Sequence, residues 1–218
     1  MYGDWFTRRG PVFCAGIEVA TPDPFLGHKN TIDDHLADTV AVVDAFHVIK
    51  LAAACVDDAR RRVQHDTLAH RGRKGDPLYG IRMILRTGRE GLTDRQHARL
   101  NAAFSAHEQH VEVEIAWQVA HDVRDLFHAD TRADGRRAAE RLLRALPTNP
   151  IREVKRLGRT LNRWAKPLLA YFATDGASNG GTKAINGLIG LHRRIARGSC
   201  NCGNYRLRML LIGAGLAP

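Results

Sequence analysis

Two aspartates follow strand-like runs, where a carboxylate could meet a ligand. Asp23 comes directly after the run 15–21 and Pro22, and Asp44 ends the valine-rich run 39–43. Open α/β sheets place their ligands at the carboxyl ends of their strands. Carboxylate oxygens at such a position suit a hard cation such as Mg²⁺. Asp44 has two other ordinary uses, because it could equally cap the helix that follows it or pair with His47.

A segment of small residues near the carboxyl end predicts a second place where the chain could contact a ligand. Residues 178–186 read Ser-Asn-Gly-Gly-Thr-Lys-Ala-Ile-Asn and predict a loop that opens an amphipathic helix. Glycine lacks a Cβ and tolerates unusual dihedral angles, so the backbone there can come close to a ligand. Lys183 places an ammonium in the first turn of the helix, where the macrodipole favours acidic groups.

The most strongly amphipathic segment starts at Pro150 and is predicted to be one continuous helix through Phe172. Its apolar side chains recur at helical spacing, and basic side chains occupy the rest of its circumference. This pattern is typical of a core helix with a solvated charged face, and equally of a helix that follows a DNA backbone. Under the second interpretation the DNA-contacting side chains are Arg156, Arg159 and Arg163.

The elements that would position these residues alternate near the amino terminus and then become helical. A strand over 15–21, a helix over 27–36 and a strand over 39–43 predict a βαβ unit in a parallel or mixed sheet. Thr93 and Gln96 have the spacing of a capping box at a helix start. Further helices are predicted over residues 46–63, 78–86, 111–126 and 136–146, with a basic loop over 70–77.

Composition narrows the class of partner. The 218 residues include 33 Lys and Arg against 23 Asp and Glu, which gives a net charge of +10 and favours an acidic partner such as nucleic acid. No apolar run reaches the ~18 residues of a membrane span, and no secretory signal is recognisable, so we expect a cytoplasmic protein without a membrane partner. The spacing of Cys200 and Cys202 differs from that of zinc ribbons, so the cysteines are expected to be thiols.

Several blocks, in order along nearly the whole chain, resemble the transposases of the ISL-three family of bacterial insertion sequences. Residues 178–186 are similar to its Ser-Asn-Gly-x-Thr-Glu-Ala-Ile-Asn signature, and 23–28 to its Asp-Pro-Phe-Arg-Gly-Tyr block. Residues 44–50 match its Asp-x-Phe-His-Val-x-Lys block. The remaining matches are a basic connector and a carboxyl-terminal block, over 60–62, 70–79, 192–198 and 204–208.

This resemblance implies a fold and a catalytic centre. The implied fold class is α/β, a partial ribonuclease-H-like core with a large all-helical insertion, predominantly helical overall. Residues 1–50 would be part of the core, 51–174 the insertion and 175–218 the carboxyl-terminal core helices. The family's Asp-Asp-Glu triad holds Mg²⁺ for DNA strand transfer, in which two divalent ions steady the attacking and leaving oxygens. Asp23 takes the place of the second aspartate and Lys183 that of the glutamate, with Asp44 a weaker candidate.

The departures from the family pattern predict a loss of activity. Lysine replaces the triad glutamate, and the strand that carries the family's first aspartate is not recognisable before residue 15. We therefore expect a catalytically inactive transposase fragment, for which Mg²⁺ binding is doubtful and DNA, including transposon ends, is the implied partner. Arg193 and Arg194 join the DNA-contacting candidates, and the location would be bacterial, with the nucleoid.

Two alternatives remain open. The chain could be a non-enzymatic DNA-binding or dimerising fragment that assembles as a homo-oligomer, or with an intact transposase and interferes with it. It could also fold poorly, because an incomplete sheet leaves an unpaired edge that invites aggregation.

Overall fold

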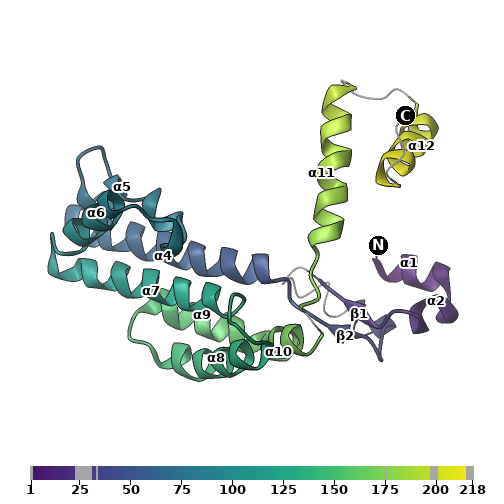
Figure 1. The fold of residues 1–218 in the computed structure, drawn as a ribbon, viewed down its shortest axis with the longest axis horizontal. Coiled ribbons are helices and arrows are strands. Elements are labelled where there is room, and N and C mark those ends of the chain that lie inside the picture. Colours follow the sequence, from purple (N-terminus) through teal and green to yellow (C-terminus); the bar gives the residue numbers. More distant parts are fainter. Residues whose placement is uncertain (1, 23–30, 33, 175, 197–200, 215–218) are drawn as a thin grey trace. The chain divides into compact units, whose positions relative to one another are not determined.

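A computed structural model describes residues 2–22, 31–32, 34–174, 176–196 and 201–214 (Figure 1). The chain divides into two compact units, Met1–Ala177 and Ser178–Pro218, and each is described by itself. The described part is predominantly helical, as predicted, and its only sheet has two strands. Within it, no helix combines the length and apolar character needed to cross a bilayer. A complete ribonuclease-H-like core is not established by these elements.

The two strands lie parallel, as expected for a βαβ unit. β1 (Val19–Ala20) and β2 (Val40–Ala41) pair with Val19 opposite Val40. The Val40 amide donates to the carbonyl of Glu18 at 2.9 Å, and the Val42 amide donates to that of Ala20 at 2.8 Å. Both strands are shorter than the runs 15–21 and 39–43 that predicted them. Of the helix expected over 27–36, residues 31, 32, 34 and 35 are helical, and most of the rest lies outside the described residues.

The segment before β1 is helical rather than extended. α1 (Tyr2–Arg9) is followed by α2 (Pro11–Ala15), so the strand predicted from Ala15 starts four residues late. Gly10 separates the helices with φ of 82°, a value that suits glycine, and Pro11 then opens α2. A proline at the first helical position loses no intrahelical bond, which explains why this apolar segment forms a helix.

Two long helices form the centre of the first unit. α4 (Ala45–Leu68) and α7 (Val111–Asp125) run side by side (Figure 1). α4 begins where predicted and continues beyond the expected end, to a cap at Ala69 in the left-handed region with φ of 55°. The two helices share a core with the helices that follow α7. Its buried members include Val48, Ala52, Cys55, Ala59, Ala116, Val123, Val154, Leu157 and Leu161.

The segment between α4 and α7 contains short elements. The helix predicted over 78–86 is divided into α5 (Pro77–Gly80) and a 3₁₀ turn, η1 (Ile84–Arg86), with a turn between them. Helix α6 (Asp94–Phe104) starts at Thr93, where both bonds of the predicted capping box with Gln96 are present. Two further 3₁₀ turns are η2 (Arg89–Gly91) and η3 (Glu108–His110).

The helix predicted from Pro150 through Phe172 is two helices. After α8 (Arg132–Ala145) and η4 (Leu146–Thr148), α9 (Arg152–Arg163) ends at Trp164, where φ is −106°, and α10 (Ala165–Ala173) begins. Pro167 accounts for the break, because proline has no amide to donate to the carbonyl four residues earlier and its ring crowds that carbonyl. The prediction of one continuous helix was therefore wrong at this point.

The second unit contains α11 (Gly180–Ile195) and α12 (Cys202–Gly213). Helix α11 has no buried residue, and its apolar side chains Ile185, Leu188, Leu191 and Ile195 are exposed. Met209 and Ile212 of α12 are buried, whereas its three leucines are exposed. Helices α11 and α12 contact each other, and the side chain of Ile185 lies close to Gly213.

Candidate functional site

Asp44 is buried three residues after the end of β2, at the position that precedes the first residue of α4. Its carboxylate makes no capping hydrogen bond to that helix, and its Oδ2 lies 3.1 Å from Nδ1 of His47. Of the alternatives open from the sequence, pairing with His47 is therefore the one that the geometry displays. The preceding backbone is fixed by the amide of Val43, which donates to the carbonyl of Pro167 in α10 at 3.2 Å.

Lys183 lies at the start of α11, where the predicted loop opens the predicted helix. Asn179 precedes the first helical residue without a side-chain cap, and the amide of Lys183 donates to the carbonyl of Asn179 at 3.0 Å. The lysine is the fourth helical residue and is half-buried. It stands at the amino-terminal end of the macrodipole, which stabilises anions rather than cations.

The described residues do not fit the divalent-metal site that the resemblance implies. Asp23 lies outside the described residues. Among the residues that are described, no three His, Cys, Asp or Glu side chains come together as metal ligands. At the position of the family glutamate the donor is an ammonium, which has no lone pair for Mg²⁺. Asp44 belongs to the first unit and Lys183 to the second.

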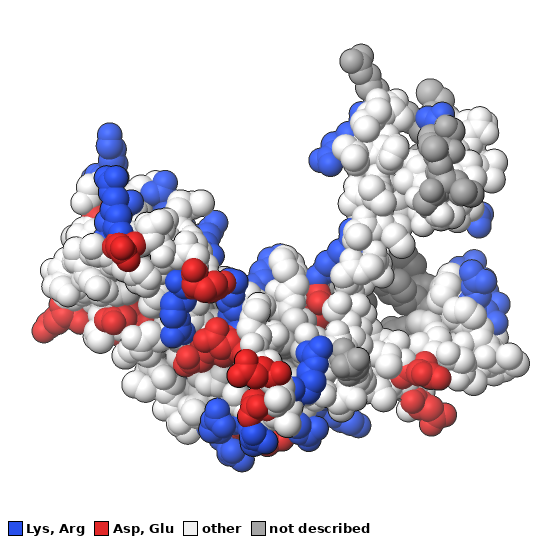
Figure 2. Space-filling view, viewed as in Figure 1, with Lys and Arg blue, Asp and Glu red and all other residues white. Residues whose placement is uncertain are grey.

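The three arginines of α9 share one exposed face. Arg156, Arg159 and Arg163 follow spacings of three and four residues, which place them in a single row along a helix. The guanidinium of Arg156 forms an ion pair with Asp58 of α4, although its side chain is 65% exposed. For the other two, no ion pair is recorded within the described ranges. On the face of the first unit that Figure 2 draws, basic and acidic side chains are interleaved.

Arg193 and Arg194 lie in the last turn of α11 and are exposed. Cations are stabilised at a helix carboxyl terminus by the macrodipole, typically by a few tenths of a kcal/mol to ~1 kcal/mol. This local role is sufficient to explain their position. They belong to the second unit, so the structure treats them as a pair separate from the row on α9.

A buried ion-pair cluster joins three helices of the first unit, and the sequence analysis did not predict it. Nε of Arg62 in α4 lies 2.9 Å from Oε1 of Glu153 in α9, and the same guanidinium contacts Glu112 of α7 at 2.5 Å. The Glu153 side chain is only 5% exposed. Burial alone would raise the pKa of Glu153, but hydrogen bonds from Arg62 and Arg152 outweigh it and hold the pKa below its ordinary value. The hydrogen bonds that Arg62 donates to Glu153 also raise the pKa of Arg62.

One signal in the sequence could have revealed this cluster. Glu153 stands four residues before Leu157 and eight before Leu161, so it lies on the apolar stripe of its helix. An acidic side chain on a buried face needs a cationic partner. The partner itself could not be identified, because Arg62 is 91 residues away in the chain.

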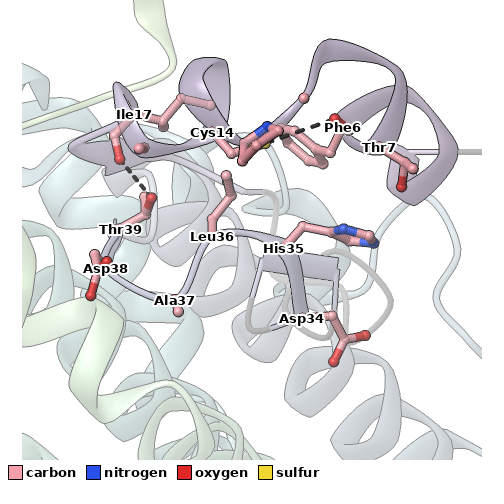
Figure 3. A pocket seen from close by; sticks show the side chains of 13 residues that line it. Phe6, Thr7, Cys14, Ile17, Asp34, His35, Leu36, Ala37, Asp38 and Thr39 are labelled. Atoms are coloured by element: carbon pink, nitrogen blue, oxygen red, sulfur yellow. Dashed lines mark hydrogen bonds between the residues drawn. The ribbon is translucent and has the colours of Figure 1, made fainter.

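A hollow of about 440 Å³ lies beside the amino-terminal helices (Figure 3). Figure 3 shows the ring of His35 facing Phe6, with which it stacks at a centroid distance of 6.1 Å. The Cys14 thiol faces the carbonyl of Phe6 at 3.8 Å, and the hydroxyl of Thr39 donates to the carbonyl of Ile17 at 2.6 Å. These contacts join residues of the wall to one another.

The elements and the basic helix define a predominantly helical protein with a short parallel strand pair and an arginine-rich surface. A family model described as "Transposase", that of the ISL-three DDE transposases, matches residues 2–209. The chain therefore belongs to this transposase family. No curated protein and no solved structure matches it.

Proposed function

We propose that this chain is a transposase-lineage DNA-binding protein that does not perform metal-dependent strand transfer. The observation that carries the proposal is Lys183, at the amino-terminal end of α11, in the segment that resembles the family signature, whose residue at this place is the third metal-binding acid. Membership in the transposase family supports DNA as the partner. The α9 row and the arginines that end α11 supply cations of the kind that contact phosphates.

The chemistry of an ammonium explains the loss of activity. A carboxylate at position 183 would give an oxygen ligand to a divalent cation, whereas Lys183 offers only donors and a positive charge. Two unit charges of the same sign 4 Å apart repel by about 4 kcal/mol at an effective dielectric constant of 20, and a divalent ion doubles that repulsion. This repulsion acts against metal occupancy even where other carboxylates are present.

The decisive test is a strand-transfer assay with the purified chain, a labelled DNA carrying terminal repeats, and Mg²⁺ or Mn²⁺. We expect no cleaved or joined product with either ion. We also expect the chain not to bind Mn²⁺ at millimolar concentrations. Binding is measured as a decrease in the electron paramagnetic resonance signal of unbound Mn²⁺. Products that depend on the metal and on the chain would overturn the proposal.

The Lys183→Glu variant distinguishes the effect of this lysine from the effect of the other missing metal ligands. We expect it to bind Mn²⁺ more tightly than the parent, because repulsion is replaced by attraction, without recovering strand transfer. The Lys183→Gln variant is the matched control, since it removes the positive charge without adding a ligand of the same strength. Recovery of strand transfer in Lys183→Glu would show that this lysine alone disables the chain.

A second candidate function is interference with an intact transposase. The row of exposed apolar side chains on α11, which includes Ile185, Leu188 and Leu191, favours this alternative because such a row is typical of a surface that pairs with another chain. The test is to titrate the purified chain into a strand-transfer reaction of an active family member. Inhibition that persists when DNA is in excess would support pairing between the proteins.

A further inference from the structure

A second hollow, of about 400 Å³, lies where the end of α4, the loop after it and the start of α9 meet. Four of its lining residues are arginines from three separate segments of the chain. Figure 2 shows basic side chains over the loop that joins α4 to α5. The lining consists of Arg61, Arg62, His65, Asp66, Arg71 and Arg152.

The floor of this hollow is held in place by the buried cluster. Arg62 is only 13% exposed and is fixed by Glu153 and Glu112, so its position does not depend on a ligand. The rim is different, because the side chains of Arg61 and Arg152 are 53% and 72% exposed. Arg71 is also exposed. A fixed floor with exposed guanidinium groups around it is a preorganised arrangement for an anion.

The arginines around the hollow outnumber the carboxylates that pair with them. Asp57 is shared by Arg60, Arg61 and Arg86, and Glu153 is shared by Arg62 and Arg152. Glu112 and Asp66 both pair with Arg62. Six arginines, with Arg71 included, thus face four carboxylates. Arg71 forms no recorded ion pair within the described part of the chain. The surplus of positive charge favours an anion such as a phosphodiester.

The hollow also continues the basic row on α9. Arg152 is the first residue of that helix, and Arg156, Arg159 and Arg163 follow it at spacings of four, three and four residues. These spacings keep all four on one face of the helix, with successive members about 4.5–6 Å apart along its axis. A phosphate seated at Arg152 would therefore lie at one end of a row that can contact further phosphates of the same strand.

We propose that this hollow binds a backbone phosphate of DNA and so fixes one end of the nucleic acid along α9. The inference rests on the proposed function for its choice of DNA as the partner. Guanidinium groups suit this role because their planar N–H donors match the oxygens of a phosphate group. Asp66 on the rim opposes an anion, so the contact is expected to be strongly salt-dependent.

The test compares the full chain with the double variant Arg71→Gln/Arg152→Gln, by fluorescence anisotropy on a short DNA duplex over a series of salt concentrations. Arg71 lies outside the buried floor, and the loss of the Arg152 bond to Glu153 leaves that carboxylate paired with Arg62, so the variant should keep its fold, as checked by circular dichroism. The slope of log K against log salt should become shallower by about 1–2, since each phosphate contact contributes about 0.9. Arg144→Gln is the matched control, an exposed arginine in the last turn of α8.

A second measurement does not depend on any variant. Phenylglyoxal modifies accessible arginines, and peptide mass spectrometry locates the products. We expect duplex DNA to protect Arg71 and Arg152 at least fivefold more than Arg144. Equal protection of all three, or an unchanged salt slope in the double variant, would overturn the site while leaving DNA binding by the chain intact.

The remaining outcomes concern the source of the phosphate. Protection of Arg71 by inorganic phosphate or a free nucleotide, at the same phosphate concentration and to the same extent as by duplex, would overturn the assignment to DNA. Absence of any DNA binding by the parent chain would overturn both this assignment and the proposed function. The site is supported if the salt slope becomes shallower in the double variant but not in Arg144→Gln, and if duplex DNA selectively protects Arg71 and Arg152.

Discussion

His121 is a buried histidine of α7 whose charged form the fold opposes. Its ring packs edge-on against Trp117 at a centroid distance of 4.5 Å, and its Nδ1 has no hydrogen-bond partner among the described residues. Burial, followed by the charge of Arg89, lowers the pKa of His121 from its ordinary value of 6.5. In the unfolded chain the ring takes up a proton near that ordinary value, so acidification favours the unfolded state.

The sign of this linkage gives a testable prediction. Stability is complete above about pH 6.5 and falls as the pH decreases from there towards the lowered pKa of the folded state. We expect His121→Phe to reduce the loss of unfolding free energy between pH 7 and pH 5.5 by up to about 1.4 kcal/mol. Urea unfolding at both pH values measures this.

Single residues also mark what the sequence can and cannot reveal. Asp44 was recognisable as a carboxylate at a strand end, and its pairing with His47 was one of three open alternatives. The position of Lys183 at a helix start followed from the glycines before it. By contrast, the hollow around Arg71 was not predictable, because its arginines come from segments that only the tertiary fold brings together. Asp23 stays a prediction.

At the scale of elements, the ion pair between Arg62 and Glu153 connects α4 to α9. Breaking a buried pair from one side leaves an uncompensated charge, which typically costs 3–5 kcal/mol. We expect Arg62→Met to destabilise the first unit by that amount, because Glu153 loses its principal partner. The double variant Arg62→Met/Glu153→Leu should recover at least half of the loss. Urea unfolding of the two single variants and the double variant measures the coupling, and additive effects would contradict it.

Close contact between α9 and the turn before it depends on a glycine. A Cβ at Gly158 would lie 2.6 Å from backbone and Cβ atoms of Leu146, which cannot move aside as a flexible side chain could. We expect Gly158→Ala to destabilise the first unit by about 1–3 kcal/mol through overpacking.

Gly187→Ala is the matched control for this substitution. Gly187 lies within α11, and a Cβ there would meet nothing within 4 Å. Alanine is the better helix former by about 0.5–1 kcal/mol, so this change should be stabilising. Thermal unfolding followed by circular dichroism compares the two variants, and equal effects would contradict the contact at Leu146.

The elements themselves were predictable where local chemistry decides them. The capping box at Thr93 and the helices predicted over 46–63 and 111–126 each agree with the sequence pattern, because local chemistry acts within a few residues. The helix from Pro150 was predicted too long, since the effect of Pro167 was not weighed against a strong amphipathic pattern. The strand runs were predicted longer than they are, and the helical start at Pro11 was missed.

At the scale of the whole molecule, thiol chemistry can distinguish the two units. Burial raises the pKa of Cys55 to about 12, and its side chain is inside the core of the first unit. The thiolate is the reactive form of cysteine, so Cys55 should resist alkylation at neutral pH. Cys202, which is exposed in the second unit, should react rapidly.

The measurement is alkylation by iodoacetamide with peptide mass spectrometry at increasing urea concentrations. We expect Cys202 to be labelled without urea. Before the unfolding transition of the first unit, Cys55 should be labelled at least a hundredfold more slowly than Cys202, and its labelling should rise across that transition. Labelling of Cys55 at the rate of Cys202 in the absence of urea would show that the core is open. A sharp onset for Cys55 would also exclude the poorly folded alternative for the helical part.

Because α9 ends at Trp164, its length limits how much of a DNA backbone it could follow. Twelve residues of helix extend for about 18 Å, and one turn of the double helix takes about 34 Å. A strand that follows α9 thus winds away after roughly half a turn. If DNA binds as proposed, one copy of the chain contacts only a short stretch of its backbone along α9, and contact over a longer stretch requires further surfaces or further copies.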